Sequence, residues 1–265
     1  MTILTDTIAE SGLTEFRRCS LRESAFFVLL LGCCVLALPL ASTGVSDASP
    51  KVPRIATMDA QQILTAMLAD AKQQKSCTST STSLLSGIPF RLVTDSSTKA
   101  GEQFLSYDGA AMALRVVKGI VYVYANRGGL FIQFGVKEPQ FVDKWIEVTP
   151  TFREYSQMEG GVLLASMLAE LPPTGALTTT NRLTVHGERT VAIMGKPNKK
   201  SGFSSGNETI YVSAKAPYLL IEVTISGVTT GDVRGFEVTF SNWGKVFQIV
   251  KPANAVPVSE LKVPS

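Results

Sequence analysis

Short segments in which apolar and polar residues alternate strictly are the feature that most constrains this fold. The clearest one has apolar residues at every second position, namely Leu219, Ile221, Val223 and Ile225. A period of two is typical of a β-strand with one packed face and one wet face. Lys118-Gly119 joins two other segments through only two residues, so those strands must pair antiparallel. The sequence therefore predicts an antiparallel sheet with one buried face.

The strand pattern covers most of the chain after residue 87. Predicted strands are 88–94, 103–107, 111–117, 120–124, 130–134, 182–186, 190–194, 209–212, 218–225, 233–240 and 246–250. Residues 127–129 are predicted to form a turn. Residues 76–83 alternate Ser and Thr, which fits either a polar linker or a first strand, because threonine is β-branched.

Two amphipathic helices interrupt the strands. Asp59 followed three residues later by Gln62 is a capping-box signal, and helical spacing of apolar residues predicts a helix over 60–74. A second helix is predicted over 159–171, where Pro172 ends it. About eleven strands with two helices predict an α+β fold, a strongly curved antiparallel half-barrel with two or more helices on its concave side.

The N-terminal part of the chain has the layout of an export signal. An uncharged apolar run at 25–41 follows Arg17-Arg18 and Arg22, and such basic residues stay on the cytoplasmic side. Three outcomes stay open: cleavage near Ala41, retention as a membrane anchor, or lipidation of Cys33 in a lipobox-like sequence. Because the arginine pair partly matches a twin-arginine signal, the export route stays open too.

These signals divide the chain into five parts. They are a cytoplasmic n-region (1–24), a signal-peptide core or membrane anchor (25–42), a flexible linker (43–57), the folded domain (58–252) and an extended C-terminal tail (253–265). The domain is expected in the cell envelope on the periplasmic side of the cytoplasmic membrane, where it is anchored, lipidated or released by cleavage.

The residues needed for catalysis do not cluster in the sequence. The single histidine, His186, lies in a predicted strand without a motif partner, and the one domain cysteine, Cys77, lies among serines and threonines. No phosphate-binding loop, dinucleotide motif or nucleophile elbow occurs. The net charge is only +3 and no basic cluster is present, which argues against a nucleic-acid partner. The sequence predicts a non-enzymatic protein with no cofactor and no metal site.

Short motifs follow one another in an order that resembles a known family. They are Gly119-Ile120-Val121-Tyr122-Val123, Asp143-Lys144-Trp145-Ile146-Glu147-Val148, Ile210-Tyr211-Val212, Ala216-Pro217-Tyr218 and Phe240-Ser241-Asn242-Trp243-Gly244-Lys245-Val246. With the helix that follows Asp59, they resemble the LppX/LprG type of actinobacterial lipoproteins, which share a LolA-like fold. The resemblance extends to about Pro252 and implies a half-open barrel whose hydrophobic cavity binds acylated lipids or glycolipids. The poor lipobox departs from the family and bears on membrane tethering.

Two functions therefore stay open. One is a carrier of acyl lipid or glycolipid at the outer face of the cytoplasmic membrane, with an envelope transporter as partner. The other is a protein-interaction or sensing module without a lipid cavity. Candidate cavity residues follow from strand parity, so a slip of one residue would invert any strand. They are Leu64, Met67, Met112, Leu114, Val116, Leu130, Ile132, Phe134, Ile221, Val223, Phe236 and Val238.

Overall fold

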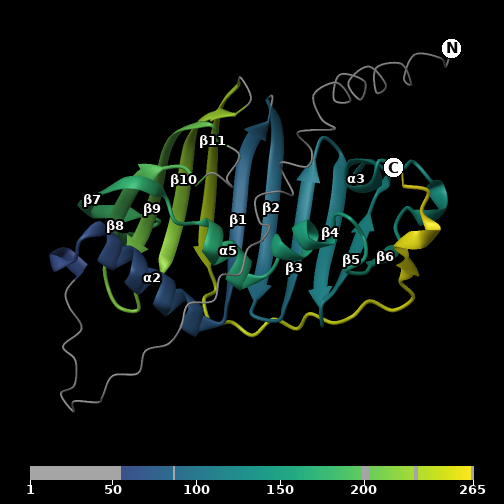
Figure 1. Cartoon of the computed structure of the whole chain (residues 1–265), viewed down its shortest axis with the longest axis horizontal. Coiled ribbons are helices and arrows are strands. Elements are labelled where there is room, and N and C mark those ends of the chain that lie inside the picture. The colour runs from purple at the N-terminus through teal and green to yellow at the C-terminus, as the bar shows by residue number, and fades with distance from the viewer. Residues whose placement is uncertain (1–54, 86, 199–202, 230–231, 264–265) are drawn as a thin grey trace.

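One sheet of twelve strands organises the protein. The computed structural model describes residues 55–85, 87–198, 203–229 and 232–263. The order across the sheet is β12-β6-β5-β4-β3-β2-β1-β11-β10-β9-β8-β7. Neighbouring strands are antiparallel, except that β12 runs parallel to β6. The early and the late part of the chain thus each form a meander, and the two meet where β1 pairs with β11 (Figure 1).

Most strands span six to twelve residues. Their bounds are β1 Ser76–Leu85, β2 Ile88–Ser97, β3 Ala100–Tyr107, β4 Ala110–Val117, β5 Ile120–Ala125, β6 Trp145–Val148, β7 Thr174–Val185, β8 Glu188–Lys196, β9 Ser205–Ser213, β10 Leu220–Thr229, β11 Asp232–Ser241 and β12 Val256–Pro257. The predicted turn at Lys118-Gly119 is confirmed, and both residues have the positive φ that a type I′ hairpin requires. The Ser/Thr segment forms a strand, β1, rather than a linker.

The helices lie against one face of the sheet, in front of the strands in Figure 1. They are α2 (Ala60–Gln74), α3 (Arg127–Phe134), α4 (Tyr155–Gly160) and α5 (Leu164–Glu170), with 3-10 turns η1 (Ile55–Thr57), η2 (Pro139–Phe141) and η4 (Val258–Glu260). The predicted capping box of α2 is confirmed, because the Asp59 carboxylate accepts the Gln62 N–H at 2.8 Å and the Gln62 side chain accepts the Asp59 N–H. The predicted fold class is confirmed: a curved, unclosed sheet with helices on its concave side.

The predicted strand at 130–134 is wrong, because these residues belong to helix α3. The side chain of Asn126 accepts the N–H of Gly129 at 2.9 Å and caps the helix. Gly129 also lets the helix approach β4 closely, since an added Cβ would lie 2.5 Å from the Ala111 carbonyl oxygen. The predicted turn at 127–129 is therefore the first turn of this helix.

Two further elements differ from the prediction. The helix expected over 159–171 is interrupted, since α4 ends at Gly160 and α5 begins at Leu164. The strand expected at 246–250 does not form. That segment instead runs along the lower edge of the sheet towards β12, below the strands in Figure 1, and exposes Val246 and Val250.

The alternation of β10 contains one irregularity. The register with β9 shifts between Leu220 and Glu222, so that Ile221 is the extra residue of a β-bulge. Leu220 and Val223 consequently both point into the core, although they are three residues apart. The prediction that Ile221 shares a face with Val223 is therefore wrong.

The buried apolar residues form two clusters under different helices. In the first cluster, α2 and α5 pack on β8, β9, β10 and the adjoining part of β11; its members include Ile63, Leu64, Met67, Leu164, Ile193, Ile210, Leu220 and Val223. In the second, α3 and α4 pack on β4, β5 and β6; its members include Met112, Leu114, Val121, Val123, Leu130, Phe134, Ile146 and Met158. The core is thus divided along the sheet. The first cluster also includes Cys77 at the start of β1, and the rest of β1, with most of β2 and β3, lies between the two clusters.

The predictions for the N-terminal region lie outside the described residues. They comprise the n-region, the signal-peptide core or anchor, lipidation of Cys33, and all of the linker except its last three residues. Among the helices that the structure does describe, none combines the length and apolar character needed to cross a bilayer.

Candidate functional site

The Ser/Thr alternation of β1 determines what each face of the sheet presents at its centre. Cys77 is buried in the first cluster, so the odd-numbered residues of β1 face the concave side. These include Ser79, Ser81 and Ser83, whereas the larger threonines of β1 point to the convex side. In the middle of the concave face, β1 therefore presents small side chains with hydroxyl groups.

One row of concave residues crosses the sheet from the first cluster to the second. Residues that pair directly across antiparallel strands lie on the same face, so the row can be followed through the register. Its members, in order, are Val223, Val238, Ser81, Leu92, Leu105 and Met112. We call this set the crossing row. Apart from Ser81 it is entirely apolar, and it therefore joins the two separate parts of the core.

Below the crossing row, the concave face is closed by the link between α4 and α5. The side-chain amide of Gln103 donates to Thr94 Oγ1 and to the Gly161 carbonyl oxygen, both at 3.1 Å. Beside it, Val162 packs on Gly101, where an added Cβ would lie 2.4 Å from the valine Cγ1 atom. Through these contacts the segment between α4 and α5 packs directly on β2 and β3, without space between them.

The crossing row itself is only partly covered. Leu92, Leu105 and Val238 are half-buried, in contrast to the fully buried residues of either cluster. Ser81 is 3% exposed, yet its hydroxyl oxygen has no hydrogen-bond partner within the described residues, and the same holds for Ser83 Oγ. Burying a hydroxyl group without a hydrogen-bond partner is unfavourable. The described residues therefore leave two hydroxyl groups on this part of the face without hydrogen bonds.

The structure separates the predicted cavity residues instead of gathering them around one space. Leu64, Met67 and Val223 are buried in the first cluster, with Phe236 and Val238 packed against it. The second cluster contains Met112, Leu114, Val116, Leu130 and Phe134. Ile132 and Ile221 belong to neither cluster. Sequence reasoning missed Leu92 and Leu105, the residues that connect the two groups, although both lie at concave positions of predicted strands.

No family model matches the chain, and no curated protein matches its sequence. Solved structures do resemble it. LprF from Mycobacterium bovis is 20% identical, with a TM-score of 0.49 over 74% of this chain and 97% of the other. The lipoprotein LppX of Mycobacterium tuberculosis is 14% identical, with a TM-score of 0.48 over 72% of this chain and 98% of the other.

A third similar structure is an uncharacterized conserved protein from Thermus thermophilus, 12% identical, with a TM-score of 0.43 over 75% of this chain and 98% of that protein. The predicted resemblance to LppX is confirmed as a resemblance. At these identities and scores the resemblance carries no functional argument.

Burial raises the pKa of two titratable groups on the concave side, Cys77 and Glu208. Burial, assisted by the nearby Asp95 carboxylate, raises the pKa of the Cys77 thiol to about 12, so the thiol stays protonated and unreactive at neutral pH. Burial also raises the pKa of Glu208 to about 7, although the backbone N–H of Asn198 donates to its carboxylate and acts in the opposite direction. Within the described residues, neither the Cys77 thiol nor the Glu208 carboxylate forms a hydrogen bond with another titratable side chain.

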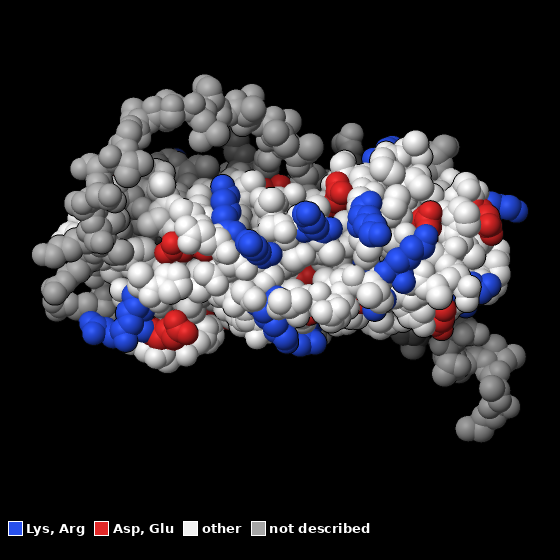
Figure 2. Space-filling view, turned by 90° about the horizontal axis from the view of Figure 1, so that it is seen from below, with Lys and Arg blue, Asp and Glu red and all other residues white. Residues whose placement is uncertain are grey.

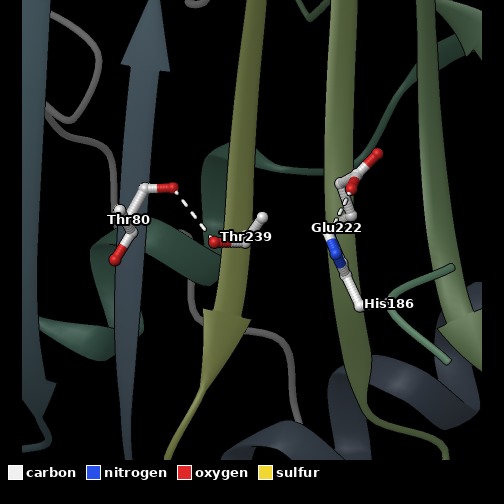
Figure 3. Close-up of polar contacts among 4 residues, drawn as sticks. All are labelled: Thr80, His186, Glu222 and Thr239. Carbon is white, nitrogen blue, oxygen red and sulfur yellow. Dashed lines mark hydrogen bonds and ion pairs between the residues drawn. The ribbon is translucent and has the colours of Figure 1, made fainter. Parts of the chain in front are cut away.

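The sole histidine has a partner that its sequence neighbours do not reveal. Nε2 of His186 lies 2.7 Å from Glu222 Oε2 on the convex face, although 36 residues separate them (Figure 3). In the same view, Thr239 Oγ1 donates to the Thr80 carbonyl oxygen, which links β11 to β1. Both contacts lie on the face opposite the crossing row, because Glu222 and Thr239 alternate with Val223 and Val238.

A pocket of about 380 Å³ lies at the other end of the molecule. Its walls come from β6, the residues that follow it and the C-terminal segment around η4, and include Glu147, Phe152, Val258 and Leu261. None of the predicted cavity residues lines this pocket.

Proposed function

We propose that the protein is a non-enzymatic carrier that holds the acyl chains of a lipid or glycolipid against its concave face. The observation that carries this proposal is the crossing row. It is an apolar path between two packed clusters, and the described helices lie to either side of it or below it. A ligand seated there would complete the cover that the chain's own elements provide only in part.

The energetics of such a ligand are those of burying hydrocarbon. The row crosses six strands, so at a strand spacing of about 4.8 Å it extends for about 24 Å. Each methylene group buried along it contributes about 0.8 kcal/mol. Because the floor consists of side chains of mixed shape and not of a specific polar site, binding would select acyl chains as a class.

The serines of β1 add a polar element to this apolar path. Ser81 and Ser83 present hydroxyl groups without partners within the described residues. An ester carbonyl or a hydroxyl of the lipid would pair with them and remove the cost of burying them unpaired. This favours ligands whose polar linkage lies between acyl chains over plain hydrocarbons.

The place of action that we propose is the cell envelope, next to the outer face of the cytoplasmic membrane. Lys75 directly precedes β1, Lys99 lies between β2 and β3, and Lys118 lies between β4 and β5. Because these strands alternate in direction, the three lysines lie at the same end of the sheet, where β2 and β4 end at the bottom of Figure 1. Figure 2 shows this edge from below, with basic side chains spread along it and acidic ones between them. Lysines near an anionic bilayer contribute about 1 kcal/mol each, so this edge is suited to face lipid headgroups.

A second candidate function uses the sheet edge instead. Among the described strands, none pairs with the outer side of β7, and its residues 178–181 are all exposed. Such an edge can accept an extended peptide as a further strand. Two register irregularities in β7 twist this edge, however, which is a common device against unwanted strand pairing.

Native mass spectrometry of the full chain tests the carrier proposal. The protein is purified in mild detergent from the membrane fraction of its expression host. We expect bound acyl lipid on the wild type and at least tenfold less on the variant Leu105→Glu, which places a charge in the crossing row. The matched control is Phe104→Glu on the same strand. Phe104 is 48% exposed on the convex face, so this variant should keep its lipid.

If Leu105→Glu does not fold, a milder substitution in the crossing row can still test the proposal. Val238→Thr preserves side-chain shape and adds one hydroxyl to the row, and we expect it to reduce bound lipid several-fold without a change of secondary structure by circular dichroism. Wild-type protein free of acyl lipid from several hosts, or equal occupancy in the concave and convex variants, would refute the carrier function.

A further inference from the structure

A group of three metal-ligating side chains lies on the convex face, away from the crossing row. It consists of His186 in the β7–β8 turn, Glu222 in β10 and Glu237 in β11. One ligand atom of each lies within 4.8 Å of the other two. The register explains the arrangement of the carboxylates, because Glu237 pairs with Thr224, two residues from Glu222 along β10. The turn brings the imidazole over them, as Figure 3 shows for His186 and Glu222.

We propose that His186, Glu222 and Glu237 bind a divalent transition-metal ion of the Zn²⁺ type. One imidazole nitrogen and two carboxylates are donors that Zn²⁺ accepts, and three protein ligands leave a position for water or a further ligand. Ligand atoms around a tetrahedral zinc ion lie about 3.4 Å apart, as follows from bonds of about 2.0–2.1 Å. The three side chains therefore need only a small contraction to reach this geometry.

The burial pattern of the three residues suits an anchored site. Glu222 is 8% exposed and is held by its strand, so it offers a fixed ligand. His186 and Glu237 are exposed and can turn towards it.

Charge also favours a cation at this place. Two carboxylates that share a site repel one another, and a nearly buried carboxylate such as Glu222 has lost much of its hydration. The imidazole of His186 is its hydrogen-bond partner and, when neutral, does not offset this charge. A divalent ion would offset both carboxylates at once and would tie the hairpin at the sheet edge to the more central strands β10 and β11.

The single histidine makes a direct test simple. In the full chain labelled with ¹⁵N only in histidine, the imidazole signals arise from one residue. The protein is prepared without a histidine tag, and accessible thiols are alkylated so that Cys19, Cys33 and Cys34 cannot bind the ion. ZnCl₂ is the probe. We expect a saturable shift of the imidazole nitrogen signals at micromolar zinc.

Three variants identify the ligands. Glu237→Gln, at an exposed position, should weaken the zinc response at least tenfold without affecting the fold, and Glu222→Gln should do the same. Glu188→Gln, an exposed acidic residue of the same hairpin, is the matched control and should respond as the wild type does. No shift up to 1 mM zinc (about a −4 kcal/mol limit on binding), or a shift unchanged in both ligand variants, would overturn the proposed site. Neither result bears on lipid binding, which concerns the opposite face.

Discussion

Buried polar side chains on the concave side differ in how many hydrogen bonds the fold offers them, and Glu208 is a clear example. Its side chain is 1% exposed between Gly195 of β8 and Ile225 of β10. The backbone N–H of Asn198 donates to its carboxylate at 3.0 Å. The carboxylate form is thus held in apolar surroundings that favour the protonated acid.

This raised pKa predicts how stability changes with pH. The folded state binds the Glu208 proton more tightly than the unfolded state, so this contribution to stability is complete below pH 4.5 and is lost as the pH rises through about 7. Glu208→Gln should therefore raise the free energy of unfolding at pH 8, by about 3 kcal/mol at most. Urea denaturation at pH 5 and pH 8 measures this. A variant that is destabilised equally at both pH values would contradict the assigned ionisation.

At the scale of elements, α3 shows how a local cap decides between helix and strand. Asn126 does more than cap the helix at Gly129. Its side-chain oxygen also accepts the N–H of Ala111, and its amide donates to the Gly109 carbonyl oxygen at 2.8 Å. One side chain therefore joins the start of α3 to the end of the β3–β4 turn and the start of β4.

Removing this side chain should loosen α3 from the sheet. We expect Asn126→Ala to reduce the free energy of unfolding by about 1–2 kcal/mol, because it deletes the cap and the two hydrogen bonds that tie α3 to Gly109 and Ala111. Asn126→Asp keeps the acceptor and should cost less than the alanine variant. Chemical denaturation followed by tryptophan fluorescence compares the two. Equal losses would show that the cap is not what holds α3 in place.

The elements that were predictable share strong local signals. Helix α2 has its capping box and a regular apolar stripe, and the strands around Lys118-Gly119 have both alternation and a two-residue turn. Residues 130–134 alternate as a strand would, and the signal for helix is the cap at Asn126 with two glycines that permit close packing on β4. Residues 246–250, by contrast, alternate poorly. Whether they find a strand to pair with depends on the arrangement of the whole sheet, which local sequence does not reveal.

The candidate site was predictable only in part for a related reason. Strand parity correctly placed Val223, Val238 and Met112 on the concave face. It failed at Ile221, because a bulge changes parity without a clear sequence signal. The crossing row depends on the pairing of β1 with β11, which joins residues about 160 positions apart, and the contact of His186 with Glu222 depends on a turn that folds over two strands.

At the scale of the whole molecule, one long sheet serves two purposes. Its ends bind helices tightly and form the two clusters, which provide stability. Its centre carries small and half-buried residues on the concave side, which we propose to be the surface that a lipid covers. The division of the core into two clusters is what leaves this central surface available, so stability and the proposed binding are provided by different parts of the same sheet.

Photo-crosslinking with a lipid that carries a diazirine on its acyl chain tests this account most directly. After illumination and digestion of the full chain, the modified residues are located by mass spectrometry. We predict adducts at concave positions of the crossing row, in particular Leu92, Leu105 and Val238, and none at the neighbouring exposed Phe104. Adducts confined to the convex face, or spread equally over Phe104 and Leu105, would contradict the account.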